Sequence, residues 1–463
     1  MLISLQTLQH NRNKLNSLLA PQRASDPLTL LPNELALMLF EYLDFKDIVY
    51  VNRPCCLQSL NSSRAMSRVS KSWRETLTSN PYLWTELDFS HARKIVSLTA
   101  VRAYVKYSKN NVIILKSSRS ELDQRPSFFY VATHCHTLQE LYYDQPAAGE
   151  TLCRAAKAMP SLRKVSTSSR CRISLEFCLD ILQSCQSLQH VEFLSVFVPG
   201  IISESPNTRE LSNLRTLTLN MCGQSPNTDI ERVFETITRV RCLTLQGWKF
   251  PSYLANHKEF GFSSFVYLEH LNVSRSRFDR LPSLPRSIRE ISFEATDFLG
   301  HGQVIDLQDL PNLIRLSLPR NHIIEKTLDL LHKLLLSGHG KLLGLDASNR
   351  HFPAGDVECL VREGYFDAIN DLMLGQSGVN DAIAELLSER CKSLATLEIP
   401  HTQITGVGVK ALVNGLRPSL KYLGLDYCNQ VSPDAVHWAR KQGLQVSYKF
   451  PDKKMKGRKV RGG

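Results

Sequence analysis

The sequence lacks the marks of membrane, secreted and zinc-framework proteins. No apolar run approaches the ~20 residues that a bilayer-spanning helix needs, and the N-terminus has no secretion-signal layout. Twelve cysteines are present, but no Cys-x-x-Cys pair occurs, which argues against a zinc framework and a disulfide scaffold. We therefore expect an intracellular protein with free thiols, no membrane partner and no metal.

Signatures of catalysis are missing as well. The sequence shows no nucleophile paired with a base, no metal-ligand spacing and no phosphate-binding glycine loop. His134 and His136 flank Cys135 and come nearest to a metal site, but they open an ordinary repeat. The prediction is a chain that is not an enzyme and that needs no cofactor.

Charge is unevenly placed along the 463 residues. The net charge is +12, with 16 basic and 8 acidic residues in 1–120, and 7 basic and 1 acidic in 449–463. By difference, the middle of the chain carries 33 basic and 35 acidic residues. The positive character belongs to the ends, and the basic tail 449–463 is predicted to be disordered.

One pattern, apolar-x-x-apolar-x-apolar, returns through most of the chain. Its twelve starts are 20 to 29 residues apart, which matches the period of leucine-rich repeats. The starts are Leu138, Leu162, Leu188, Leu214, Val240, Leu268, Ile288, Leu313, Leu342, Ile369, Leu394 and Leu420.

This spacing predicts a stacked fold. The last two apolar residues of each unit alternate along a short strand and face inward, and a single unit cannot bury that face alone. Returning segments such as EFCLDILQSC supply amphipathic helices on the outer side. The expected fold is an α/β leucine-rich-repeat solenoid of about twelve repeats, with a parallel sheet on its concave face.

Three cysteines stand three residues before a repeat leucine. Cys135, Cys185 and Cys391 lie on different repeats, so the pattern favours small buried side chains over metal ligands. With LDYCNQVSPDAV near the end, they resemble the cysteine-containing subclass of leucine-rich repeats.

Residues 31–45, LPNELALMLFEYLDF, are more apolar than one buried helix face requires. Leu31, Leu35, Leu39 and Leu43 recur every four residues along one side, yet Phe40 and others fall elsewhere. Downstream, VSKSW and PYLW supply a second apolar cluster. A helical cap of the solenoid is one explanation, but such a cap needs a polar outer face, and this segment lacks one.

LPNEL, LFEYLD, VSKSW and PYLW, in this order, resemble the F-box, a small all-α motif. The resemblance implies that the excess apolar surface binds the Skp adaptor of a cullin-RING ubiquitin ligase. The adaptor-binding residues that it implies are Leu30, Leu31, Pro32, Glu34, Leu35, Leu39, Phe40, Leu43, Val69, Trp73 and Trp84.

The F-box spacing is interrupted by VNRPCCLQSLNSS, which is either a tolerated surface loop or a translated intron. The predicted organisation is a helical segment 1–25, an F-box 26–90 with an insertion at about 51–64, a basic linker or cap 91–130, a solenoid 131–448 and the tail 449–463.

DPLTLLPNEL and LDFSHARKIVSLTAVRAYVKYSKNNV also resemble fungal F-box and leucine-rich-repeat proteins that carry tetratricopeptide repeats and act in genome stability at chromatin. In those proteins the tetratricopeptide repeats precede the F-box. Only about 25 residues precede it here, so no function of those repeats is carried over.

The non-apolar strand positions are expected to point from the concave face and to bind a substrate there. Acidic residues dominate these positions, and only Lys164 and Arg315 oppose them, which favours a basic protein partner over nucleic acid. Solvated acids with no collective role are the alternative. The nine acids are Glu140, Asp144, Glu192, Glu290, Glu294, Asp346, Asp371, Glu398 and Asp426.

Residues 91–119 are basic and contain tyrosines, which suits either a phosphate-contacting face or a solvated helix between F-box and solenoid. The tail from Lys453 to Arg461 suits a nuclear import signal, so we expect a nuclear or cytoplasmic protein. The predicted function is the substrate receptor of an SCF-type ubiquitin ligase. The alternatives are a leucine-rich scaffold or inhibitor, and a nucleic-acid-associated adaptor.

Overall fold

A computed structural model describes residues 35, 75, 77–90, 96–117, 125–145, 149–198, 211–223, 233–234, 237–251, 261–279, 282–298, 310–318, 342–348 and 351–449. Most of the predicted F-box, with its insertion, lies outside these residues, as do segment 1–25 and the tail beyond Lys449. The chain divides into two compact units, Met1–Cys171 and Arg172–Gly463, which are described separately below.

The first unit contains a parallel sheet with helices between its strands. The strand order is β1-β2-β3-β4, and every pair is parallel. Its strands are β1 (Glu86–Asp88), β2 (Ile114–Lys116), β3 (Glu140–Tyr143) and β4 (Lys164–Thr167). Its helical segments are η2 (Pro81–Trp84), α5 (Leu98–Tyr107), α6 (Arg125–His134) and α7 (Gly149–Lys157).

The second unit continues the same architecture over a longer parallel sheet. Its order is β6-β7-β8-β10-β12-β14-β15-β16-β17-β18-β19, and β5 (Ile173–Ser174) pairs with β6. The strands are β6 (His190–Phe197), β7 (Thr216–Met221), β8 (Cys242–Thr244), β10 (His270–Asn272), β12 (Glu290–Ser292), β14 (Arg315–Ser317), β15 (Gly344–Asp346), β16 (Asp371–Met373), β17 (Thr396–Glu398), β18 (Tyr422–Gly424) and β19 (Gln445–Ser447).

The core follows the repeat pattern. The middle residue of each short strand, for example Leu271, Leu316 or Leu397, is buried, and the residues on either side of it face the other way. Each of the twelve predicted units supplies one strand to the sheet. The prediction of a leucine-rich-repeat solenoid with a parallel sheet is therefore confirmed.

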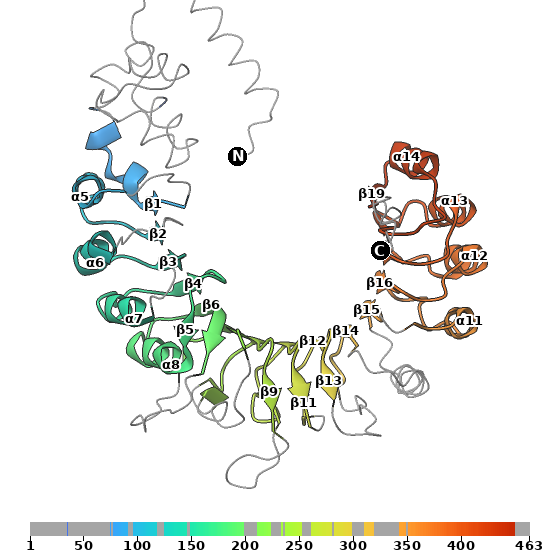
Figure 1. Cartoon of the computed structure of the whole chain (residues 1–463), viewed down its shortest axis with the longest axis horizontal. Helices are drawn as coiled ribbons and strands as arrows, with labels where there is room; N and C mark the ends of the chain where they lie inside the picture. The colour runs from blue at the N-terminus through green and yellow to red at the C-terminus, as the bar shows by residue number, and fades with distance from the viewer. Residues whose placement is uncertain are drawn as a thin grey trace, which may run out of the picture. The chain divides into compact units, whose positions relative to one another are not determined.

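In several repeats of the second unit a helix connects one strand of the sheet to the next. These helices are α8 (Leu175–Ser184), α11 (Ala354–Arg362), α12 (Asp381–Arg390), α13 (Gly406–Gly415) and α14 (Pro433–Lys441). Side chains of Ser174, Asn380, Thr405 and Ser432 cap four of them by accepting a hydrogen bond from a backbone N–H in the first turn. In Figure 1, α11 to α14 lie together on one side of strands β15 to β19.

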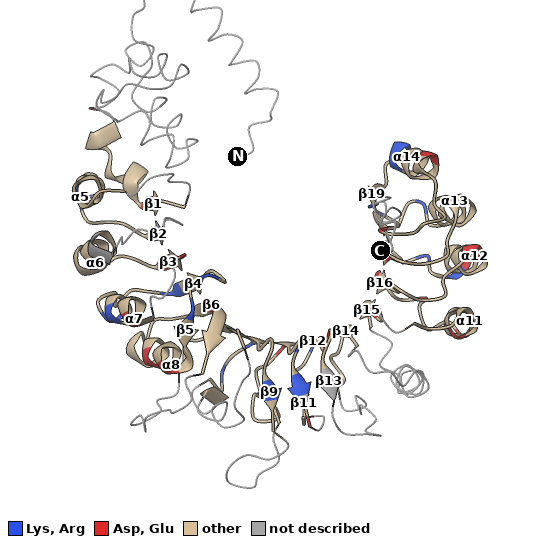
Figure 2. Ribbon diagram, viewed as in Figure 1, with Lys and Arg blue, Asp and Glu red and all other residues tan. Residues whose placement is uncertain are grey.

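The repeats between Lys249 and Phe298 contain an element that the sequence did not predict. Their described residues include a two-residue strand in each repeat, and these strands form a second parallel sheet of β9 (Lys249–Phe250), β11 (Arg277–Phe278) and β13 (Asp297–Phe298). Phe250 and Phe278 are buried and stacked, with ring centroids 4.3 Å apart. Only 20 residues separate Leu268 from Ile288, which leaves little room for a helix. Figure 2 shows one basic residue on each of β9 and β11.

The sheet also begins earlier than the sequence predicted. Strands β1 and β2 fall in segments expected to be F-box and basic linker, and they pair in parallel with each other and with β3. Their residues carry the repeat spacing, with Trp84, Leu87 and Phe89 in one and Val112 and Leu115 in the other, all buried. Residues 96–117 are therefore part of the repeat structure.

Candidate functional site

Two rows of side chains cross the second unit's sheet on the face opposite its buried leucines. We call this face the open face. Strand register aligns Glu290, Arg315, Gly344 and Asp371 in the first row. The second row continues over Ser292, Ser317, Asp346, Met373, Glu398 and Gly424.

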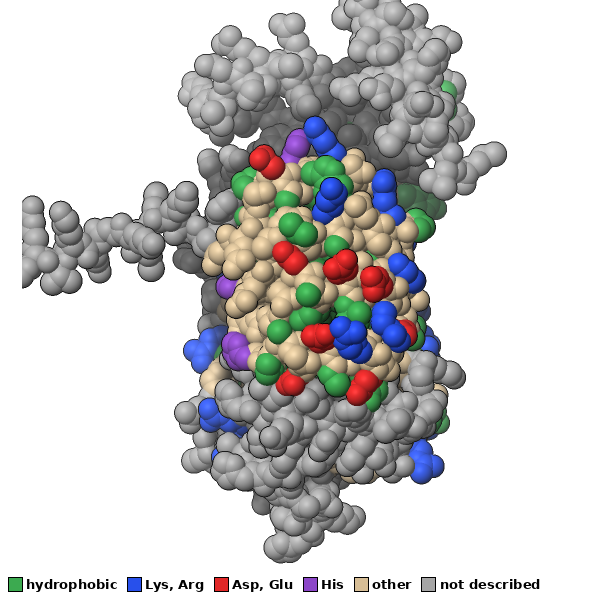
Figure 3. All heavy atoms as spheres, turned by 90° about the vertical axis from the view of Figure 1, so that its right-hand side faces the viewer, with side chains coloured by type: hydrophobic (Ala, Val, Ile, Leu, Met, Phe, Trp, Pro, Cys, Tyr) green, Lys and Arg blue, Asp and Glu red, His purple; other side chains and the backbone are tan. Residues whose placement is uncertain are grey.

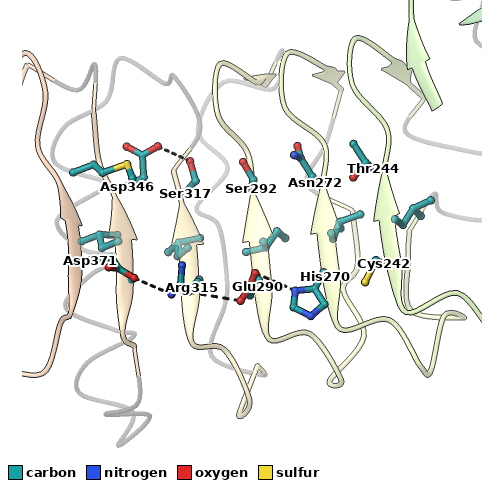
Figure 4. A pocket seen from close by; sticks show the side chains of 17 residues that line it. Cys242, Thr244, His270, Asn272, Glu290, Ser292, Arg315, Ser317, Asp346 and Asp371 are labelled. Atoms are coloured by element: carbon teal, nitrogen blue, oxygen red, sulfur yellow. Dashed lines mark hydrogen bonds and ion pairs between the residues drawn. The ribbon is translucent and has the colours of Figure 1, made fainter. Parts of the chain in front are cut away.

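A hollow of about 260 Å³ lies over strands β8 to β16 on this face (Figure 4). Its lining includes polar side chains of the two rows and the apolar residues between them on each strand, such as Leu271 and Leu316. Thr244, Asn272, Ser292 and Ser317 place hydroxyl or amide groups side by side on successive strands. The hollow therefore offers hydrogen-bonding groups in a shape that spans several repeats.

Arg315 neutralises much of the first row. Its Nη2 lies 2.8 Å from Asp371 Oδ2, and its Nε lies 3.7 Å from Glu290 Oε1. The other oxygen of Glu290, Oε2, lies 3.0 Å from His270 Nδ1. To reach Asp371, the Arg315 side chain passes over Gly344, where an added Cβ would lie 3.0 Å from Arg315 Cγ. These acids are thus already engaged with cations of the chain.

The carboxylates of the second row differ from those of the first row in their contacts with cations. Asp346 accepts hydrogen bonds from Ser317 Oγ (3.0 Å) and the Ser348 backbone N–H (3.0 Å). Among the residues that the structure describes, neither Asp346 nor Glu398 has a cation within ion-pair distance. Burial, and then the charges of Asp346 and Asp426, raise the pKa of the Glu398 carboxyl above its ordinary value. Negative charge on the open face is therefore concentrated around β15 to β18.

Asp426, whose charge contributes to the raised pKa of Glu398, does contact a cation. Its Oδ2 lies 3.3 Å from Lys449 Nζ, and its Oδ1 accepts a hydrogen bond from Ser447 Oγ at 2.8 Å. Among the described acids of the open face from β15 onward, this pairing leaves Glu398 and Asp346 without a cation at ion-pair distance.

The acids of the first unit are also engaged. Lys164 Nζ lies 4.0 Å from Glu140 Oε2 and donates a hydrogen bond to the Tyr142 hydroxyl at 2.7 Å, while Tyr142 itself donates to Glu140. Asp144 accepts hydrogen bonds from the Ser168 hydroxyl. The predicted dominance of acids is therefore weaker here than the sequence suggested.

All nine predicted acids lie in the described part of the chain. Glu294 is exposed, and the other eight, including Glu192 on β6, are half-buried, as alternation along the strands requires. Whether they bind a substrate stays a prediction. The sequence-based prediction missed His270 because it counted only lysine and arginine as basic, although His270 is at the same strand position as Glu290. It missed Lys449 because that residue lies beyond the twelve counted units.

The helix side of the C-terminal repeats contrasts with the open face. Figure 3 shows acidic and basic side chains interspersed there. Several are matched locally, as where Arg362 contacts Glu358 one turn away and Arg390 contacts Asp367. No single sign of charge marks this side.

The position of Trp84 in the structure argues against its place among the predicted adaptor-binding residues. Its side chain is 0% exposed, its ring stacks on Tyr104 with centroids 5.4 Å apart, and its Nε1 donates to the Leu77 carbonyl at 2.8 Å. Such a side chain has no surface left for an adaptor, so Trp84 is a core residue. Leu35, by contrast, is 48% exposed. The remaining adaptor-binding candidates, Leu30, Leu31, Pro32, Glu34, Leu39, Phe40, Leu43, Val69 and Trp73, lie outside the described residues.

Several side chains of the basic stretch 91–119 make contacts within the folded first unit. Lys116 Nζ lies 2.6 Å from Glu86 and 3.6 Å from Asp88, and the hydrogen bond to Glu86 raises the pKa of its amino group. Tyr104 and Tyr107 both pack on Trp84. These contacts remove one lysine and both tyrosines from a phosphate-contacting face and make them part of the repeat structure.

The three repeat cysteines are buried, as the repeat pattern indicated. Cys185 and Cys391 end helices α8 and α12, and burial raises the pKa of the Cys391 thiol to about 12 and that of Cys135 to about 11. Within the described ranges no group of metal-ligating side chains comes together, and no helix is long and apolar enough to cross a bilayer.

Comparison with known proteins bears on the N-terminal segment. Residues 28–90 match the F-box-like family model. The chain carries an F-box-like domain. It is also similar to the F-box/TPR repeat protein pof3 of Schizosaccharomyces pombe, with 24% identity over 479 residues, covering 91% of this chain and 74% of that protein. The resemblance to F-box proteins is therefore confirmed.

A likeness among solved structures is to an internalin (inlF) from Listeria monocytogenes. The identity is 13% and the TM-score 0.35, over 82% of this chain and 89% of that one. The assignment of the repeat fold rests on the strand pairing described above.

Proposed function

We propose that this chain is a substrate-recognition subunit of an SCF-type cullin-RING ubiquitin ligase. The observation that carries the proposal is the F-box-like match over residues 28–90, followed by a parallel repeat sheet. F-box domains generally bind the Skp adaptor. The sheet then offers a long open face to a protein client, and the open face of the second unit is the surface we assign to it.

In this role the chain contributes proximity. Ubiquitin transfer occurs on partner subunits, and a receptor accelerates it by holding client lysines near the charged conjugating enzyme. The hollow over β8 to β16 supports this role because it spans several repeats. We further propose a nuclear or cytoplasmic location and, on the resemblance to the fungal family, a role at chromatin.

Co-purification of the adaptor and cullin tests the proposal. Replacing Leu31 and Pro32 by alanine is expected to abolish recovery of both subunits, because the F-box resemblance assigns these two residues to adaptor binding. A matched control is Val407→Ala, which removes an exposed apolar side chain from α13. If the intact chain recovers neither subunit, it is a scaffold or inhibitor without a ligase. Strongly salt-dependent retention on DNA would favour the nucleic-acid alternative.

A further inference from the structure

One segment of the open face joins an apolar side chain to two carboxylates. Asp346, Met373 and Glu398 occupy the same register position on the adjacent strands β15, β16 and β17. Since neighbouring strands are about 4.8 Å apart, the backbones carrying the two carboxylates are about 10 Å apart, with the methionine between them. We call these three residues the Asp346 row.

The two ends of this row have different surroundings. Asp346 and Met373 line the hollow over β8 to β16. At the other end, register continues to Gly424, which has no side chain and where an added Cβ would lie 3.0 Å from Glu398 Cγ. The row is therefore bordered by the hollow on one side and by a position without a side chain on the other.

In the part of the chain that the structure describes, no cation lies within ion-pair distance of either carboxylate of the row. Two hydrogen bonds, from Ser317 Oγ and the Ser348 N–H, hold the Asp346 carboxylate in place. The nearest lysine interaction of this region, that of Lys449, is with Asp426. Burial and like charge already oppose ionisation of Glu398. A cation placed here would relieve this repulsion without having to displace a cation of the described residues.

The chemistry of the row matches one kind of side chain. Lysine and arginine combine an apolar stem, which can lie along Met373, with a cationic head that carboxylates bind through charge-assisted hydrogen bonds. A guanidinium has five donors and can contact two carboxylates. Phosphate groups of a phosphorylated client or of nucleic acid carry the wrong charge for this row.

We propose that the Asp346 row binds a lysine or arginine side chain of a protein client, the segment around that side chain lying in the adjoining hollow. This inference rests on the proposed role of the open face as the client-binding surface. Of the nine acids predicted from the sequence it uses two. Glu290 and Asp371 are engaged by Arg315, Asp426 by Lys449 and Glu140 by Lys164.

Binding of an immobilised library of short peptides to the purified full-length chain tests the proposal. Each arginine-containing peptide is paired with the same peptide carrying citrulline, and each lysine peptide with its glutamine form. We expect selected peptides to lose about tenfold or more in affinity when the cation is removed, since a charge-assisted hydrogen bond contributes at least that much.

The isosteric variants Asp346→Asn and Glu398→Gln are expected to cause a similar loss. Glu294→Gln is the matched control, because it removes one exposed carboxylate of the same face outside the row. Binding that is equal for arginine and citrulline, or unchanged in both row variants, would overturn the proposal, as would the absence of any cation-dependent peptide. Row-dependent binding of a single-stranded DNA oligonucleotide would also overturn it.

Adaptor recovery from the same variants separates this proposal from the ligase assignment. Asp346→Asn and Glu398→Gln are expected to recover the adaptor as the intact chain does, because the row is in the second unit and the F-box-like segment in the first. Peptide binding without adaptor recovery would leave the row assigned and the ligase role rejected. Adaptor recovery without peptide binding would do the reverse.

Discussion

The guanidinium of Arg315 contacts the carboxylate of Asp371 across an intervening strand, with Nη2 and Oδ2 2.8 Å apart. The contact is possible because position 344, between them in the strand register, is glycine. One arginine thereby engages acids on both sides of its own strand, Asp371 and Glu290. The potential of the open face depends on such cross-strand reach as well as on which residues are acidic.

Removing that guanidinium is expected to cost little stability. Because the Arg315 side chain is 54% exposed, Arg315→Gln should lower the free energy of unfolding by no more than about 1 kcal/mol. Glu290 and Asp371 would then repel each other, so added salt should stabilise the variant more than the intact chain. Urea denaturation at low and high ionic strength measures both effects. Arg362→Gln, which breaks an ion pair within α11, is the control; equal salt responses in the two variants would contradict the assigned role of Arg315.

Trp84 is expected to be essential for folding of the first unit. Its indole is buried against Tyr104 and Tyr107, so Trp84→Ala should lower the free energy of unfolding by about 3–5 kcal/mol. The neighbouring Tyr82 is 85% exposed, and Tyr82→Ala should change it by less than about 0.5 kcal/mol. Thermal unfolding of the two variants gives the comparison. A Trp84→Ala chain as stable as the Tyr82→Ala chain would restore Trp84 as a surface residue.

The repeat core could be predicted from the sequence because its signal is local and periodic. Apolar residues at fixed spacing located one strand in each of the twelve units, from β3 in the first to β18 in the last, but not the short strands β5, β9, β11 and β13. The alternation placed acids such as Asp371 on the opposite face. Strands β1 and β2 were missed because a tryptophan, Trp84, opens one repeat and a serine, Ser117, closes the other.

The electrostatics of the site could not be predicted in the same way. Which acids are neutralised depends on side-chain reach between strands about 25 residues apart in sequence, as between Arg315 and Glu290. The role of Gly344 likewise cannot be predicted from the sequence, because it depends on the strand register, which places Gly344 between Arg315 and Asp371. The acids of this face can be counted in the sequence, but the structure is needed to see which of them contact a cation. Among the described residues, Asp346 and Glu398 are the open-face acids from β15 onward that contact none.

Gly408 is expected to tolerate no side chain. It lies in the first turn of α13 beside Asp381, whose Oδ1 accepts hydrogen bonds from the Gly408 and Thr405 backbone N–H groups at 3.0 and 2.8 Å. An added Cβ would lie 2.4 Å from that oxygen and 2.7 Å from Ile404 Cγ1. Gly408→Ala should therefore lower the free energy of unfolding by about 1–3 kcal/mol.

The control for this change is Gly355→Ala in α11, where an added Cβ meets nothing within 4 Å. Alanine restricts the unfolded chain more than glycine does, so this variant should be as stable as the intact chain or slightly more stable. Urea denaturation of the pair checks the prediction. Equal midpoints would show that α12 and α13 can move apart at no cost.

The cysteines are expected to react in two groups with a thiol-alkylating reagent. Cys359 is exposed, and the hydrogen bond from its thiol to Glu363 raises its pKa. Cys135, Cys171 and Cys391 are buried, and desolvation raises their thiol pKa values to about 11 or 12. At neutral pH, Cys359 should be modified in the folded chain and the buried three only after unfolding. Peptide mass spectrometry before and after denaturation gives the order. Modification of Cys391 in the folded chain would contradict its assignment to the core.

Glu398 is expected to lower stability at neutral pH. Its folded-state pKa is raised above the ordinary value of 4.5, chiefly by burial and then by Asp346 and Asp426, so the folded chain holds this proton more tightly than the unfolded chain. Its destabilising effect is absent below that ordinary value and grows as pH rises through the raised pKa. Glu398→Gln should therefore match the intact chain in melting temperature at about pH 4 and exceed it at about pH 8. Glu294→Gln, which removes an exposed carboxylate of the same face, is measured in parallel as the control for loss of a charge. A Glu398→Gln chain that gains nothing at the higher pH would mean that the carboxylate already has a cation, which removes the physical basis for a client lysine or arginine at this position.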